Sequence, residues 1–107
     1  MRRHLIFLLL LLAAACSSQE ADKASSWIAT LQFTGELWLA NSVPTAFVCT
    51  TIDSADKDLA KISDPEVADE VSKARGWAQE MRDAVEKNDR TRVAEVVKRF
   101  AALPRKQ

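Results

Sequence analysis

The chain has 107 residues with 15 basic and 15 acidic side chains, so its formal net charge is zero. A chain of this length supports one small domain but not two. The even balance of charge argues against nucleic acid as a partner, because nucleic-acid-binding domains carry a marked excess of Lys and Arg.

The first fifteen residues have the pattern of an export signal. Arg2 and Arg3 precede an apolar run of eleven residues, 5–15, that ends in three alanines. As a helix this run would cover roughly half of the ~30 Å hydrocarbon core of a membrane, which is too short for a permanent span. A basic start, a short apolar run and small residues before a cleavage point are typical of a secretory signal peptide. We therefore expect a cleaved leader and an exported protein.

The end of this leader resembles the signal of bacterial lipoproteins. The resemblance rests on Leu12, Ala13, Ala14, Ala15 and Cys16, since in that family small residues precede a cysteine. The commonest pattern of the family has leucine where Ala13 stands. The resemblance implies that residues 1–15 are removed and that the sulfur of Cys16 carries a diacylglycerol, whose acyl chains (palmitate is typical) enter the membrane.

The same resemblance bears on location. Ser17 follows the cysteine, whereas the family's inner-membrane retention signal has aspartate there. The resemblance therefore implies lipid anchoring in a bacterial cell envelope, with the outer membrane facing the periplasm favoured in a source that has two membranes. The alternative is an ordinary signal peptide cut after Ala15, which leaves Cys16 as a free or paired thiol.

Residues 16–25 are small and polar, and we expect them to form a short tether between the lipid and a domain at residues 26–107. The domain begins with a predicted helix over 26–40 that is apolar on two sides. One side carries Ile28, Leu31 and Leu39 with Gly35 and two tryptophans. The other side carries four apolar residues, Ala29, Phe33, Leu37 and Ala40.

The second side of this helix is the candidate partner-binding face. If the other helices bury only the tryptophan side, Phe33, Leu37 and Ala40 form an exposed apolar patch, which is the usual mark of a partner site. The alternative is that a neighbouring helix covers them, since burial on two sides is ordinary for a central helix.

The three tryptophans, Trp27, Trp38 and Trp77, also allow two interpretations. As core residues they supply much of the apolar burial that a small domain needs. As a binding feature they line a groove between helices for an aromatic or lipid ligand.

Proline and aspartate mark the next two helix starts. Pro44 suits the first turn of a second helix, which we expect to run to about residue 62. Asp64 is a predicted N-cap, and Pro65 the first residue of a third helix. Gly76 lies inside that third helix, where it costs about 1 kcal/mol relative to Ala. We expect it to allow the close approach of another helix, with a kink as the alternative.

The last helix starts after the predicted cap Asp89 and runs to about residue 102. The final segment, residues 90–107, carries six basic residues and only one acidic residue, Glu95. We expect this helix to dock on acidic neighbours in the same domain, and a basic patch for anionic lipids or an acidic partner is the alternative. Four periodic segments with short links predict an all-α fold, a small antiparallel bundle of three to four helices.

The mature chain lacks most catalytic side chains. The only histidine, His4, lies in the leader, and tyrosine is absent. Histidine-based catalysis and histidine metal ligands are therefore excluded. The sequence also has no glycine-rich phosphate loop, and we expect no metal and no cofactor. Cys49 is the remaining thiol, and a small half-buried hydrophobe is its expected role. A reactive thiol is the alternative, because Cys49 lies a turn or two after Pro44 at a helix start. The sequence does not favour an enzyme.

These features lead to two functional hypotheses. The first is a non-enzymatic, membrane-anchored helical module that binds another protein, or itself, at the bacterial envelope. The alternative is a carrier of small apolar ligands or lipids that uses a tryptophan-lined pocket in the bundle.

Overall fold

The computed structural model describes the backbone of residues 2–104 and the side chains of residues 19–104. The side chains of the predicted leader and of Cys16 lie outside this range. Within the described chain there are four helices and no strand, which confirms the all-α prediction. The helices are α1 (Arg2–Leu39), α2 (Thr45–Leu59), α3 (Ala68–Glu86) and α4 (Arg90–Ala102).

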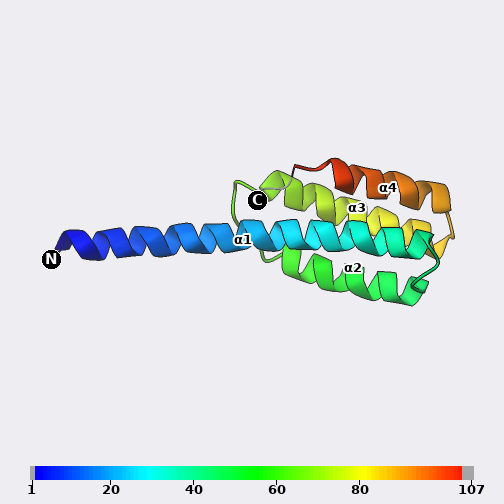
Figure 1. The fold of residues 1–107 in the computed structure, drawn as a ribbon, viewed down its shortest axis with the longest axis horizontal. Coiled ribbons are helices and arrows are strands. Elements are labelled where there is room, and N and C mark those ends of the chain that lie inside the picture. Colours follow the sequence, from blue (N-terminus) through cyan, green and yellow to red (C-terminus); the bar gives the residue numbers. More distant parts are fainter. Residues whose placement is uncertain (1, 105–107) are drawn as a thin grey trace.

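The helices form an antiparallel bundle in which successive helices reverse direction (Figure 1). Each helix packs on the next along the chain, and α4 packs on α1. α1 also contacts α3 across the bundle, so it touches all three other helices. The N-terminal part of α1 continues beyond the bundle as the same helix (Figure 1).

The core consists of the apolar stripes that the helical spacing predicts. All four helices contribute side chains that are almost fully inaccessible, which is what a bundle with one apolar stripe per helix requires. The largest of these are Phe100, Leu31, Ile52, Leu59, Met81, Val48, Val93 and Val96.

Gly35 determines how closely α1 approaches the helices opposite. A Cβ atom at this position would lie 2.5 Å from Cγ2 of Val97 on α4 and 3.0 Å from Sδ of Met81 on α3. By contrast, a Cβ atom at Gly76 would meet nothing within 4 Å. The prediction that Gly76 allows a close helix approach is therefore wrong, and Gly35 has that role instead.

Two asparagines end helices in the same way. Asn41 after α1 and Asn88 after α3 have φ of 59° and 54°, in the left-handed region that closes a helix C-terminus. After Asn88, the N–H of Asp89 donates to the carbonyl of Ala84 at 2.8 Å. The Asp89 carboxylate then accepts from the N–H of Arg92 at 3.2 Å, which confirms Asp89 as the cap of α4.

The third helix begins later than predicted, at Ala68 and not at Pro65. The Asp64 carboxylate accepts from the N–H of Glu66 at 3.0 Å, and the Asp64 carbonyl accepts from the N–H of Val67 at 3.2 Å. These bonds close a turn ahead of the helix, because an aspartate side chain can satisfy the same N–H groups in a turn as at a helix start.

The first helix begins earlier than the predicted residue 26. Ala24 is 2% exposed within the core, and Ala21 packs against it. Ala21, Ala24 and Ile28 are spaced three and four residues apart, so they share the face of α1 that meets the core. Part of the segment 16–25, predicted as a tether from its small polar residues, therefore belongs to the bundle.

The two glycines provide a matched test of this packing. Gly35→Ala should lower the free energy of unfolding by about 1–3 kcal/mol, because the added methyl overlaps Val97. Gly76→Ala should raise it by about 1 kcal/mol, because alanine favours the helix and the site is open. Urea unfolding followed by circular dichroism measures both, and equal losses of stability in the two variants would contradict the close approach at Gly35.

Candidate functional site

The outer side of α1 carries the predicted partner-binding residues. Phe33 is 59% exposed, whereas Leu31 and Trp38 on the opposite side of the same helix are buried in the core. Leu37, one turn further along, is half-buried, and Ala40 is exposed. The structure thus places Phe33, Leu37 and Ala40 together on the outer side of α1, where no helix of the described chain covers Phe33.

A second exposed aromatic side chain, Phe47, lies on α2 and is 47% exposed. The indole N–H of Trp38 donates to the hydroxyl of Thr45 at 3.1 Å, which holds the start of α2 level with the end of α1. Phe47 therefore lies within about one helical turn of Leu37 along the bundle axis. We call Phe33, Leu37, Ala40 and Phe47 the apolar face.

The exposure of Phe47 was not predicted from the sequence. Phe47 directly precedes Val48, which is fully buried. The sequence does show that Phe47 points about 100° away from Val48 around the helix axis. That angle alone does not show whether α1 covers Phe47.

The apolar face carries no charged side chain. Glu36 is the only charged residue between Trp27 and Val43. Its carboxylate accepts a hydrogen bond of 3.0 Å from the Gln32 side chain on the same helix. This side of the bundle therefore differs from the surfaces between α2 and α3 and between α3 and α4, which carry ion pairs.

Trp27 and Trp38 of α1 serve as links to neighbouring segments. The indole N–H of Trp27 donates to the Asp58 carboxylate of α2 at 3.2 Å. Trp38 is 6% exposed, and the Arg90 guanidinium of α4 lies 5.5 Å from its ring centroid, in the range of a cation–π contact. Trp38 is therefore a core residue with a polar contact at its edge.

Trp77 of α3 has a different neighbourhood. Its ring packs edge-on against Phe100 of α4, with centroids 5.6 Å apart. Trp27 borders an open hollow at the base of the bundle with Asp22 and Lys23, and neither Trp38 nor Trp77 lines it. The structure does not bring the three predicted ligand-lining tryptophans together around one pocket.

Cys49 is half-buried and unpaired. Its thiol lies 3.8 Å from the Glu86 carboxylate, to which it donates. Burial raises the pKa of Cys49 above its ordinary value; Arg82 lowers it in part, and Glu86 and Asp53 raise it further. Because the thiolate is the reactive form, Cys49 is a poor nucleophile at neutral pH.

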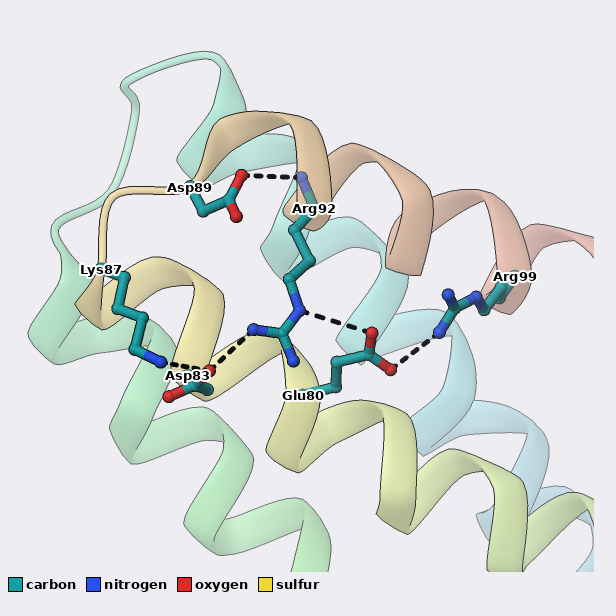
Figure 2. A network of polar contacts seen from close by, with 6 residues as sticks. All are labelled: Glu80, Asp83, Lys87, Asp89, Arg92 and Arg99. Atoms are coloured by element: carbon teal, nitrogen blue, oxygen red, sulfur yellow. Dashed lines mark hydrogen bonds and ion pairs between the residues drawn. The ribbon is translucent and has the colours of Figure 1, made fainter.

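The basic last helix pairs with α3 (Figure 2). Arg92 lies 2.7 Å from the Asp83 carboxylate and 3.5 Å from that of Glu80, and Arg99 lies 2.7 Å from Glu80. Lys87 joins Asp83 at 3.2 Å. Hydrogen bonds from Arg92 and Lys87 lower the pKa of Asp83. The prediction that α4 docks on acidic neighbours of its own domain is confirmed.

Other ion pairs join α2 to α3. Arg75 lies 2.8 Å from Asp56, and Arg82 pairs with Asp53 while donating to the Cys49 carbonyl at 3.1 Å. These pairs are partly exposed, so each contributes little to stability. Their main effect is to fix which helices are neighbours.

Comparison with known proteins adds no further constraint. No protein-family model matches the chain. Searches of curated proteins and of solved structures also find no match. Residues 19–104 contain no helix long and apolar enough to cross a membrane. In the same range, no group of three or more His, Cys, Asp or Glu side chains is placed to hold a metal ion.

The raised pKa of Cys49 predicts slow thiol chemistry at neutral pH. In a Cys16→Ser variant, the folded protein should react with a disulfide reagent about tenfold more slowly than free cysteine at pH 7.5, and the rate should rise as pH increases past 9. Glu86→Gln should accelerate the reaction, because it removes a charge that disfavours the thiolate. A fast reaction near pH 7 in the folded state would contradict this assignment, and the urea-unfolded protein serves as the control.

Proposed function

We propose that this chain is an exported lipoprotein of the bacterial cell envelope whose helical bundle binds another protein through the apolar face. The proposed module is not an enzyme. The observation that carries the proposal is the 59% exposure of Phe33 on a helix whose other side already completes the core.

The exposure of Phe33 is unfavourable in an isolated domain. A large aromatic side chain has a surface on the order of 200 Å², so 59% exposure leaves about 100 Å² of Phe33 in water. At ~25 cal/mol per Å², covering that area contributes about 2–3 kcal/mol to binding. A polar residue at position 33 would leave the observed core unchanged, so a partner accounts for phenylalanine better than the fold does.

The chemistry of the domain supports a binding role over a catalytic one. The mature sequence contains no histidine and no tyrosine. Glu80 and Asp83 of α3 pair with arginines of α4. The remaining candidate nucleophile, Cys49, has a raised pKa. An acid–base or covalent mechanism would need a group poised near neutral pH.

The two cysteines allow a direct test of the lipid anchor. Cys16→Ser should abolish incorporation of labelled palmitate and move the protein out of the membrane fraction, because the acyl chains attach through Cys16. Cys49→Ser should leave both unchanged and is the matched control. Mass spectrometry of the mature protein checks the site, and an unmodified N-terminal Cys16 would refute the anchor.

The apolar face allows a test of partner binding. Phe33→Glu with Leu37→Glu should reduce chemical cross-links between the protein and its envelope partner by at least about tenfold, because burying a charge in an apolar contact is costly. Ser72→Glu, on an exposed position of α3, is the control and should leave the cross-links unchanged.

The same samples need a measurement of folding. Circular dichroism should show the same helical content in the double variant as in the parent, since Phe33 is mostly exposed. Unchanged cross-linking in a folded double variant would refute the proposed role of the face. Loss of helical structure would show that these residues stabilise the bundle itself, and it would also count against the proposal.

A further inference from the structure

The outer side of α1 has the residue spacing of a helix that pairs with another helix. Ser26, Thr30, Phe33, Leu37 and Ala40 follow one another at steps of four, three, four and three residues. Four of them are exposed, and Leu37 is half-buried. This alternation is the spacing of the two contact positions in a coiled coil. We call these five residues the outer stripe.

The outer stripe is free of charge over its whole length. Continuing the alternation toward the N-terminus, the next position lies three residues before Ser26 and is Lys23, so the uncharged stretch begins at Ser26. A contact about a two-fold axis brings residues near their own copies, and a charge close to the axis would repel itself. An uncharged stripe meets that requirement. A contact with a different protein is usually specified by complementary charges, and this side of α1 offers only Glu36.

The continuity of α1 fixes how two anchored copies would meet. The helix runs unbroken from Arg2 to Leu39, so the backbone at Cys16 and the outer stripe belong to one rigid element. Two copies anchored at Cys16 in the same membrane leaflet therefore have their α1 helices pointing in the same direction. That is the arrangement of a parallel helix pair.

We propose that the occupant of the apolar face is a second copy of this chain, paired in parallel through the outer stripe of α1. This inference rests on the proposed function and names its partner. In such a pair, Phe33 packs near Phe33 of the second copy, and Leu37 and Ala40 extend the contact toward the top of the bundle. Phe47 flanks the contact from α2.

The contact is small, and its size sets the conditions under which it forms. Phe33 and Phe47 each expose an area on the order of 100 Å². A standard stable interface buries about 800 Å² per partner. The pair therefore needs the membrane, which confines both copies and raises their effective concentration to about the millimolar range. We expect dimers on vesicles and monomers in dilute solution when the acyl chains are absent.

The test uses single cysteines in the full-length lipidated protein. In a Cys49→Ala background, Ser26→Cys and Ala40→Cys place a thiol at each end of the outer stripe. Ser72→Cys on α3 and Thr91→Cys on α4 are exposed controls on other sides of the bundle. The proteins are reconstituted in vesicles of phosphatidylethanolamine and phosphatidylglycerol, oxidised mildly and separated without reductant.

A parallel pair predicts that Ser26→Cys and Ala40→Cys both form disulfide-linked homodimers at least about fivefold faster than the two controls, because like residues face each other only at contact positions. Adding Phe33→Glu to Ala40→Cys should reduce its rate to that of the controls. The parent without an introduced cysteine should form none; a dimer there would reveal a free Cys16 thiol and refute the anchor.

The outcomes separate this inference from the proposed function. Equal rates at all four positions, or no dimer at either end of the stripe, would refute the second copy as the occupant. If Phe33→Glu with Leu37→Glu still abolishes cross-links to an envelope protein, the proposed function stands and the partner is a different protein. If those cross-links are also unaffected, both are refuted.

Discussion

The fold depends on the close packing of α1 against α4 and α3 at Gly35. α1 contacts all three other helices, and without a side chain at position 35 it can lie against Val97 and Met81. On the tryptophan side of α1, around this contact, Leu31 and Trp38 are buried in the core. The same contact leaves the opposite side of α1 facing outward. The burial of one side and the exposure of Phe33 thus have a single cause.

Much of the fold could be predicted from the sequence, because helical spacing and local capping are short-range properties. The four apolar stripes and the Asp89 cap depend only on residues within a few positions of each other. The errors arose where local rules allow two solutions. Asp64 can close a turn as well as start a helix, and the small polar residues before Ser26 can extend a helix as well as form a linker.

The candidate site was harder to predict for a different reason. A helix that is apolar on two sides indicates that burial of both sides is favourable. The pattern does not show how many neighbouring helices are present to cover them. The exposure of Phe33 and Phe47 depends on how the helices pack together, and that packing joins residues far apart in the sequence. The pairs of Arg82 with Asp53 and of Arg92 with Asp83 show the same limit, since they join residues on different helices.

If the proposed anchor at Cys16 holds, the unbroken course of α1 also limits the reach of the domain. Phe33 lies seventeen positions after Cys16, and at 1.5 Å per residue the helix places it about 25 Å from the backbone of Cys16. A flexible linker would let the domain take up many positions above the membrane, whereas a helix would hold it at a fixed distance. With the proposed anchor, a copy would engage only what comes within a few nanometres of its own bilayer, and it would not bridge to a distant surface.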